Sequence, residues 1–260
     1  MPATFPSHAG VVLPLKLWRP RWFDGVALTT GTVAPDIRYI FLGVGPDWNS
    51  HTLPALLWWC LPVALVGAWL IRGTVATVAA HLPHLGPLAL RDYGVLGTVR
   101  HRWYVTLGSA LLGAASHLGW DFLTHTNGWL RTVFGVDWDR MHDVPWWTVS
   151  DIPSSAVGAL ATLTVALVIG RRRLLRAWHG APPAVPTRPA VFWSVVGTVG
   201  IIGYVVTPFL PGHDLPWATV VRLLCLTAAV LLLAAGVVQA TNARTGPAAA
   251  AKPTQHSSHR

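Results

Sequence analysis

The sequence predicts an all-α protein, a polytopic transmembrane helix bundle that begins with a short or re-entrant helical hairpin. Composition gives the first reason, because 52% of the 260 residues are hydrophobic and only 11% are charged. In a soluble domain about a quarter of the residues are charged. Length gives the second reason, since four or five apolar stretches meet or approach the roughly 20 residues that a helix needs to cross a bilayer.

Two apolar pieces near the start of the chain are too short to cross a membrane comfortably. They cover about His8–Leu17 and Phe23–Val33, and the basic turn Lys16–Arg21 lies where they meet. Backbone polar groups inside a membrane must be satisfied by the protein itself. We therefore expect these pieces to form a re-entrant or partly spanning helical hairpin that is buried against other helices.

The longer apolar stretches are expected to form the membrane spans. The segment Thr74–Leu90 is also apolar, but histidine, proline and glycine residues interrupt it, so we expect an interfacial segment or a loop there. The expected spans are roughly Leu53–Ile71, Trp103–Leu123, Ile152–Gly170, Ala190–Leu210 and Ala218–Ala240.

These elements divide the chain into four parts. Residues 1–170 are expected to form a membrane-embedded domain that holds a candidate metal site, and residues 171–189 a basic, Pro-rich linker. Residues 190–240 are expected to form a two-helix transmembrane hairpin. Residues 241–260 are rich in Ala, Pro, Ser and His, a composition that predicts a disordered tail.

The net charge of +9 is distributed in a way that indicates a membrane protein and no nucleic-acid partner. Arg and Lys residues fall in short clusters between the apolar stretches, as orientation signals do, and such clusters favour the cytoplasmic side. One topology in the cell membrane places every basic cluster and the C-terminal tail in the cytoplasm. It places residues 36–51, 121–151 and 211–216 on the extracytoplasmic side.

His117, Asp121 and His125 follow one another at intervals of four residues near the end of the second long stretch. On a helix this spacing keeps them on one face, but each step rises about 6 Å. One ion therefore cannot contact both histidines at the ~2.1 Å that zinc requires. Either the helix loosens near Thr126–Gly128 and brings His125 back, or Asp121 bridges two ions.

Three further ionisable residues lie on the same predicted side of the membrane. His8 starts the hairpin, Asp36 follows its return, and His51 precedes the first full span. Imidazoles and carboxylates are natural ligands of zinc and similar divalent ions, and ionisable groups in membrane segments are usually paired or functional. The alternative is a set of interhelical hydrogen bonds in a polar core. The predicted ligands of one or two divalent ions, most simply zinc, are His8, Asp36, His51, His117, Asp121 and His125.

Four short motifs carry a resemblance to a known family. Over about residues 1–170 they resemble the bacterial membrane family called domain of unknown function 4184. That family is similar in turn to predicted membrane-bound metal-dependent hydrolases and to the zinc-dependent phospholipase C group. The motifs are Pro6-Ser7-His8, Ala34-Pro35-Asp36, Ser50-His51-Thr52-Leu53 and Ser116-His117-Leu118-Gly119-Trp120-Asp121 with Thr124-His125 behind it.

The resemblance implies metal-ligand roles for the same six residues, and it implies no known substrate. The sequence departs from the expected pattern at one place, before the third long stretch. A segment similar to Gln-His-Gly-Ser is expected there, and this chain has Ser150-Asp151-Ile152-Pro153 instead. Either Asp151 substitutes for that segment or one ligand is missing.

The segment between the second and third long stretches carries four tryptophans together with Arg131 and Arg140. Tryptophan at headgroup level commonly anchors a protein in the membrane, and the alternative is a lid over a lipid-sized pocket. The two arginines either bind a phosphate bidentately or balance the charge of nearby Asp residues.

The expected function is that of a membrane-embedded metal-dependent hydrolase. A divalent ion lowers the pKa of a bound water and polarises a phosphoryl or carbonyl oxygen. Asp36 or Asp121 is the candidate to bridge ions or to accept the proton of that water. A site at the extracytoplasmic headgroup layer favours an amphiphilic phosphoester or ester, such as a phospholipid or a lipid-linked phosphate. The alternatives are a non-enzymatic metal-binding or transport protein and a structural helix bundle.

Overall fold

The computed structural model describes residues 4–44 and 48–245, and it confirms the all-α fold class. These residues form helices and connecting turns without any strand. Four helical segments are both long enough and apolar enough to cross a membrane, which agrees with a polytopic bundle. They are Leu56–His81, Trp146–Arg171, Pro189–Phe209 and Pro216–Arg244.

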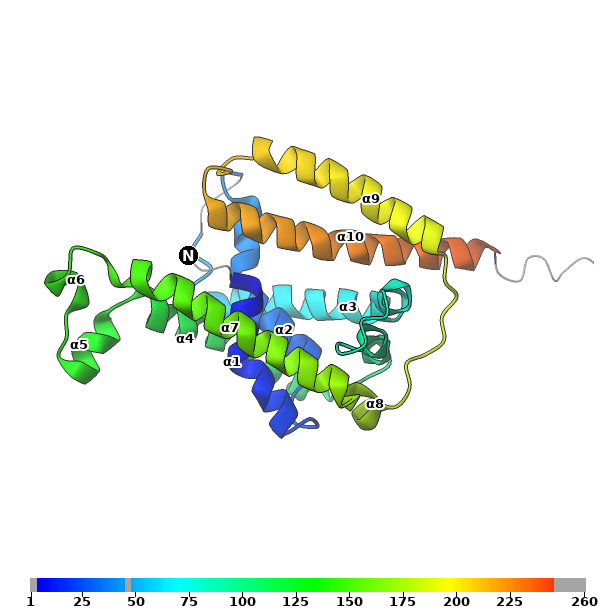
Figure 1. The fold of residues 1–260 in the computed structure, drawn as a ribbon, viewed down its shortest axis with the longest axis horizontal. Coiled ribbons are helices and arrows are strands. Elements are labelled where there is room, and N and C mark those ends of the chain that lie inside the picture. Colours follow the sequence, from blue (N-terminus) through cyan, green and yellow to red (C-terminus); the bar gives the residue numbers. More distant parts are fainter. Residues whose placement is uncertain (1–3, 45–47, 246–260) are drawn as a thin grey trace, which may run out of the picture.

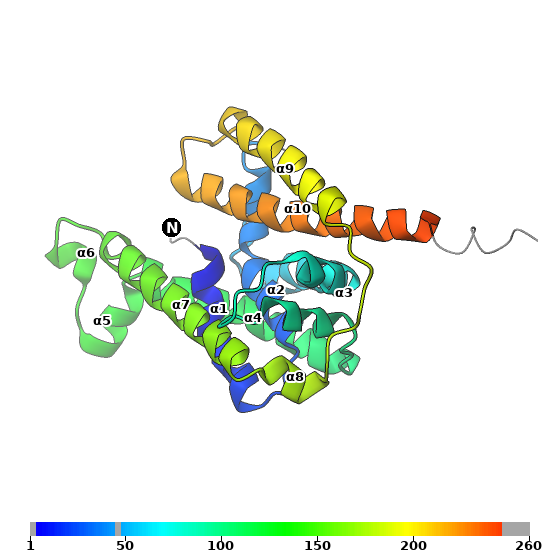
Figure 2. The same cartoon turned by 45° about the vertical axis from the view of Figure 1, so that its right-hand side comes forward.

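These four segments run lengthwise through the molecule (Figure 1). They contain α3 (Leu61–His81) with the π-helical turn η2 (Leu56–Cys60) before it, α7 (Trp146–Arg171), α9 (Pro189–Val206) with the 3₁₀ turn η4 (Thr207–Phe209) after it, and α10 (Pro216–Thr245). Figure 2 shows the same lengthwise arrangement from a second direction.

The two ends of the bundle differ in the short helices that they carry. The helices α5 (Gly128–Phe134) and α6 (Trp138–Met141) lie at one end, and α8 (Leu174–His179) lies at the other (Figure 1). We refer to them as the α5 end and the α8 end. The predicted basic, Pro-rich linker thus contains one short helix. Of the predicted disordered tail, residues 241–245 continue α10, and residues 246–260 lie outside the described part of the chain.

The helix α4 (Trp103–His125) has the length of a membrane span but is not among the four apolar segments. Its second half carries polar and ionisable residues, Ser116, His117, Asp121 and His125, which lower its hydropathy. The structure therefore supports four of the predicted spans by length and composition together. The α4 helix packs on α2 and buries His117, and the expectation that it crosses the membrane stays a prediction.

The predicted N-terminal helical hairpin is confirmed. It consists of α1 (Thr4–Trp18) and α2 (Gly25–Val33), which pack against each other, while α1 also packs on α7 and α2 on α4. Asp24 caps α2 by accepting a hydrogen bond from the backbone N–H of Ala27 at 3.2 Å. The hairpin is followed by the 3₁₀ turn η1 (Asp36–Phe41), which packs against α10.

The prediction that the first span ends near Ile71 was wrong. The helix continues to His81, because the residues after Arg72 are small and apolar, and Pro83 follows shortly after its end. Arg72 consequently lies inside α3 and pairs with the carboxylate of the buried Asp24, which also accepts a hydrogen bond from Thr106 at 2.7 Å. The ion pair between Arg72 and Asp24 thus links α2, α3 and α4. Arg72 can have this structural role in addition to being a signal for the orientation of the protein in the membrane.

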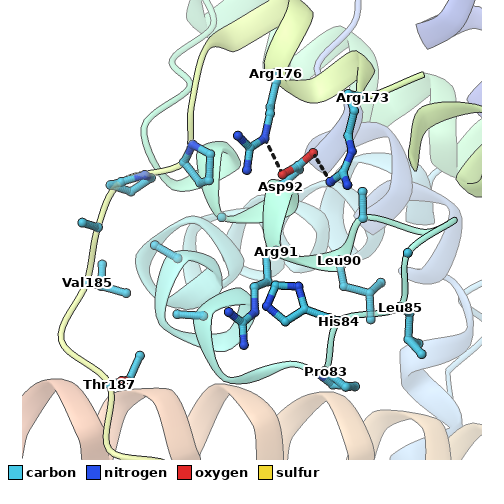
Figure 3. A pocket seen from close by; sticks show the side chains of 18 residues that line it. Pro83, His84, Leu85, Leu90, Arg91, Asp92, Arg173, Arg176, Val185 and Thr187 are labelled. Atoms are coloured by element: carbon cyan, nitrogen blue, oxygen red, sulfur yellow. Dashed lines mark hydrogen bonds and ion pairs between the residues drawn. The ribbon is translucent and has the colours of Figure 1, made fainter. Parts of the chain in front are cut away.

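A second group of ion pairs joins elements at the α8 end. The 3₁₀ turn η3 (Leu90–Gly97) packs on α3 and carries the buried Asp92. Figure 3 shows Arg173 and Arg176 reaching this carboxylate, with nitrogen–oxygen distances of 3.1 and 2.6 Å. These pairs fix α8 against η3.

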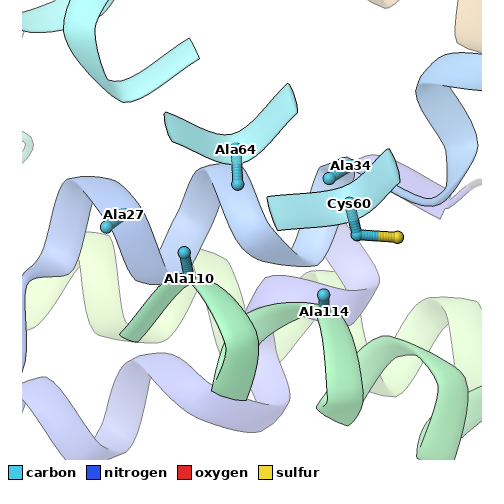
Figure 4. Packing of buried hydrophobic residues seen from close by; sticks show 6 residues of the cluster. All are labelled: Ala27, Ala34, Cys60, Ala64, Ala110 and Ala114. Carbon is cyan, nitrogen blue, oxygen red and sulfur yellow. The ribbon is translucent and has the colours of Figure 1, made fainter. Parts of the chain in front are cut away.

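Small residues allow the central helices to approach closely. Ala27 of α2, Ala64 of α3 and Ala110 of α4 belong to one buried cluster (Figure 4). Two glycines bring α2 and α4 still closer, since a Cβ atom on Gly31 or Gly113 would lie 2.2 Å from a backbone oxygen of the other helix. Small residues at such contacts are typical of helix packing in membranes. This contact fixes the distance between η1, which follows α2, and the polar half of α4.

Candidate metal centre

The structure brings the six predicted ligand residues together. His8 comes from α1, Asp36 is the first residue of η1, and His51 lies in the turn before η2; the other three come from the last turns of α4. His8, Asp36 and His117 are almost completely buried, at 0%, 1% and 0% exposure. The side chains of His51, Asp121 and His125 are 17%, 16% and 19% exposed, so the cluster has one buried and one accessible side.

Four of these residues form a ring of alternating nitrogen and oxygen atoms. The Nε2 atom of His51 lies 3.3 Å from Oδ1 of Asp36 and 3.4 Å from Oδ2 of Asp121. The Nε2 atom of His117 lies 3.6 and 3.3 Å from the same two oxygens. Two ligand atoms ~2.1 Å from a tetrahedral zinc ion are about 3.4 Å apart. The four nitrogen–oxygen distances of the ring therefore match the separation of neighbouring ligand atoms around such an ion.

Three of the four ring atoms lack the hydrogen-bond partners that buried groups normally have in the described part of the chain. Among the described residues, no hydrogen bond reaches either carboxylate oxygen of Asp36, the Nε2 atom of His51 or the Nε2 atom of His117. Buried polar groups without partners are rare, because leaving them unsatisfied costs free energy. A cation in the ring would satisfy all of these atoms together, so the residues fit a bound divalent ion.

The outer nitrogen of each ring has a partner that orients it. Nδ1 of His117 lies 2.7 Å from the carbonyl oxygen of Thr32, so it carries the proton and donates it. The lone pair of Nε2 is then directed at the carboxylates. This arrangement, a backbone acceptor behind an imidazole ligand, is usual at metal sites. Thr32 is in α2, so the close packing of α2 on α4 also orients the imidazole of His117.

A hydroxyl group precedes three of the histidines and faces the ring of each. The side-chain oxygens of Ser7, Ser50 and Thr124 lie 3.4, 3.1 and 3.1 Å from Nδ1 of the histidine that follows. This contact between hydroxyl and Nδ1 was not predicted from the sequence, although three of the motifs contain a hydroxyl residue directly before a histidine. For His8 and His51, the hydroxyl oxygen is suited to accept a hydrogen bond from Nδ1–H, which leaves the lone pair of Nε2 available for a ligand bond.

Asp121 lies at the centre of the whole cluster. Its Oδ2 atom belongs to the ring, while its Oδ1 atom lies 3.0 Å from Nε2 of His8 and 3.4 Å from Nδ1 of His125. His8 also stacks on His117 with ring centroids 3.8 Å apart. The α4 helix remains regular as far as His125, so it does not loosen before that residue. His117 and His125 face different oxygen atoms of Asp121, so the expectation that Asp121 bridges two ions stays a prediction that this geometry allows.

The accessible side of the cluster opens into two adjoining cavities. The larger, of about 790 Å³, is lined by His51, Asp121 and His125 together with apolar residues such as Leu118 and Phe122. Phe122 is 53% exposed, so the apolar wall continues to the outside of the bundle. The cavity therefore has a polar end at His51, Asp121 and His125 and an apolar end at Leu118 and Phe122.

The smaller cavity, of about 270 Å³, is polar and contains an arginine that the sequence analysis missed. It shares Tyr39, Asn49 and His51 with the larger cavity and adds Arg38 and Trp48. The guanidinium of Arg38 lies 6.0 and 5.8 Å from the ring centroids of Tyr39 and Trp48, which hold it by cation–π contacts. The feature of the sequence that could have identified Arg38 is its position two residues after Asp36, within an otherwise apolar turn.

Arg131 and Arg140, the predicted phosphate-binding candidates, lie away from this cavity lining. Both pair with Asp137, at 3.8 and 3.4 Å, and their side chains are 66% and 82% exposed. They therefore balance an acidic neighbour. Two tryptophans of the same segment, Trp129 and Trp146, donate their indole N–H groups to the carbonyl oxygen of Leu123 at 2.8 and 3.0 Å, and so attach α5 and α7 to the end of α4.

Asp151, the residue that stands where the resemblance led us to expect another ligand, is in the second turn of α7. It does not belong to either of the two groups of converging ligand atoms found in the described part of the chain. Those groups are His8, Asp36 and His117, and His51, His117 and Asp121.

Comparisons with known proteins place the chain in one family. The family model described as "Domain of unknown function (DUF4184)" matches residues 1–244. The match extends past the region of the sequence motifs and includes α9 and α10, and α10 packs on η1, the turn that carries Asp36. No curated protein and no solved structure matches the chain.

Proposed function

The chain belongs to the DUF4184 family, and we propose that it is a membrane-embedded, metal-dependent hydrolase of an amphiphilic phosphoester or ester. The observation that carries this proposal is the ring of two imidazole nitrogens and two carboxylate oxygens, 3.3–3.6 Å apart, at the polar end of a cavity whose other end is apolar. His8 and His125, on the other oxygen of Asp121, give the cluster capacity for a second ion.

A divalent ion such as zinc at this ring would lower the pKa of a bound water and polarise a phosphoryl or carbonyl oxygen. The two carboxylates then have different tasks because their burial differs. Asp36 is 1% exposed and absent from the cavity lining, so we assign it to holding the ion. Asp121 lines the larger cavity, and when one ion occupies the ring its Oδ1 atom is left outside the coordination sphere, so this oxygen would accept the proton of the attacking water. His8, which lies 3.0 Å from Oδ1 of Asp121, orients that carboxylate.

The two cavities support an amphiphilic substrate with an anionic group. The apolar wall at Leu118 and Phe122 accommodates an acyl chain, and Arg38 in the smaller cavity provides a guanidinium for a phosphate. A phosphoester therefore fits better than a neutral carboxylic ester. For the orientation, we propose that the α8 end with its arginines faces the cytoplasm and that the cluster opens at the extracytoplasmic headgroup layer.

The test is hydrolysis by the purified protein in neutral detergent, with phospholipids, p-nitrophenyl phosphate and p-nitrophenyl carboxylic esters as substrates. We expect turnover of phosphoesters that a chelator abolishes and that a divalent ion restores. The variant Arg38→Gln is expected to raise KM for the phospholipid by roughly 10-fold or more, since a hydrogen bond to a charged group contributes about 1.5–3 kcal/mol.

The matched control for this experiment is Arg131→Gln, which removes an exposed arginine paired with Asp137 and should leave KM unchanged. Bound metal without turnover of any of these substrates would contradict the hydrolase and would favour a non-enzymatic metal-binding protein. Equal KM values for the wild type and Arg38→Gln would remove the assignment of the phosphate to Arg38.

A further inference from the structure

A third cavity, of about 480 Å³, lies at the α8 end and shares no residue with the candidate metal centre. It is enclosed by the end of α3, by η3, by α8 and by residues 182–187 of the segment before α9 (Figure 3). We propose that this cavity binds a phosphate group, carried either by an anionic lipid headgroup or by a soluble phosphate compound. This proposal does not depend on the hydrolase.

The charges in the cavity lining are the first reason. The lining contains Arg91, Arg173 and Arg176, and Asp92 is its single acidic residue. Burial of the Asp92 carboxyl raises its pKa, but the hydrogen bonds from Arg176 and Arg173 outweigh burial and hold the pKa below its ordinary value. The carboxylate is therefore ionised and balances one of three guanidinium charges. The two that remain match the charge of a phosphate.

The unused hydrogen-bond donors are the second reason. A guanidinium has five N–H groups. Arg176 donates from Nε, and Arg173 from one Nη atom, to the carboxylate of Asp92. Arg91 donates from Nε to the carbonyl oxygen of Leu82 at 3.3 Å. The side chains of Arg173 and Arg176 are 55% and 50% exposed, so a ligand can reach their other donors. Asp92 thus holds two arginines in place for an anion without saturating them.

The backbone around the cavity is the third reason. Ala89 and Arg173 both have φ of +49°, and they are the non-glycine residues with positive φ within residues 4–44 and 48–245. Both line the cavity. Side chains with a Cβ atom are strained in this conformation, and such residues gather at ligand sites, where the surrounding structure maintains them. Apolar residues such as Leu85, Leu90 and Val185 complete the lining, which suits the glycerol and first acyl carbons of a lipid.

The experiment is thermal unfolding of the purified full-length protein in neutral detergent with a chelator present, so that phosphate cannot bind through a metal. The probes are inorganic phosphate, phosphatidylglycerol and, as the uncharged comparison, phosphatidylcholine. We expect phosphatidylglycerol to raise Tm in a saturable manner and phosphatidylcholine to have no effect. A parallel rise with inorganic phosphate would show that the phosphate group itself is bound, and no rise with it would identify the lipid headgroup as the ligand.

The variant Arg91→Gln is expected to weaken this response at least 10-fold in apparent Kd. It removes the hydrogen bond from Arg91 to Leu82 but leaves both hydrogen bonds to Asp92 in place, so α8 stays attached to η3. Arg176→Gln removes a second donor and should weaken binding further. The matched control is Arg100→Gln, an exposed arginine that donates to the carbonyl oxygens of Gly97 and Val99. A wild-type response to neither anion, or equal responses from Arg91→Gln and Arg100→Gln, would overturn the proposal.

Discussion

Replacing Asp121 with Asn is expected to weaken metal binding by more than about 100-fold, because even residues behind the ligands contribute 10- to 100-fold. Asp121 is the residue that contacts four histidines: its Oδ1 atom faces His8 and His125, and its Oδ2 atom faces His51 and His117. Asparagine keeps the shape of the side chain but has no negative charge. Titration of the purified variant with zinc in competition with a chelator of known affinity measures the loss.

The control for this substitution is Asp214→Asn, which removes an exposed carboxylate from the turn between η4 and α10. It should leave zinc affinity at the wild-type value, and circular dichroism should show that both variants remain helical. If Asp121→Asn binds zinc as tightly as Asp214→Asn does, Asp121 is not a ligand and the bridging arrangement is wrong.

Replacing Gly113 with Ala is expected to lower the free energy of unfolding by about 2–3 kcal/mol, the upper range for overpacking. The added Cβ would lie 2.2 Å from the carbonyl oxygen of Leu28 and 2.9 Å from the backbone nitrogen of Thr32. Both are backbone atoms of α2, so relief requires the helices to separate. Separation lengthens the hydrogen bond from His117 to Thr32, so we expect zinc affinity to fall as well. Unfolding in mixed micelles and zinc titration measure the two effects.

Gly108→Ala is the matched control, because the added Cβ lies on the same helix and has no neighbouring atom within 4 Å. Alanine favours a helix over glycine by roughly 1 kcal/mol, so this variant should be slightly more stable than the wild type. Equal stability of the two variants would mean that α2 and α4 are not in such close contact.

The gathering of the six predicted ligand residues could be predicted from the sequence because it depends on few assumptions. Apolar length indicates the spans, basic clusters indicate their direction, and the spacing of His117, Asp121 and His125 gives one helix face. Each of these features is local. The positions of His8, Asp36 and His51 then follow from the direction in which the chain crosses the membrane.

The features that the sequence analysis missed all depend on contacts between distant residues. Arg72 seemed to mark the end of a span because its partner, Asp24, lies on another helix and cannot be recognised from spacing. The backbone acceptor of Thr32 behind His117 has no signature in side-chain identity. Arg38 becomes a candidate for substrate binding only when η1 is seen beside the turn that contains His51. The ring geometry similarly requires η1, the turn before η2 and α4 to meet.

The most direct test of the central claim is the metal content of the purified wild-type protein, measured by inductively coupled plasma mass spectrometry after incubation with zinc, manganese or iron and removal of unbound ions. We predict one to two equivalents of a divalent metal per chain, with most of it lost in a protein that carries His51→Ala and His117→Ala together. Folded wild-type protein that retains no metal under any of these conditions, or the same content in the double variant, would contradict the account.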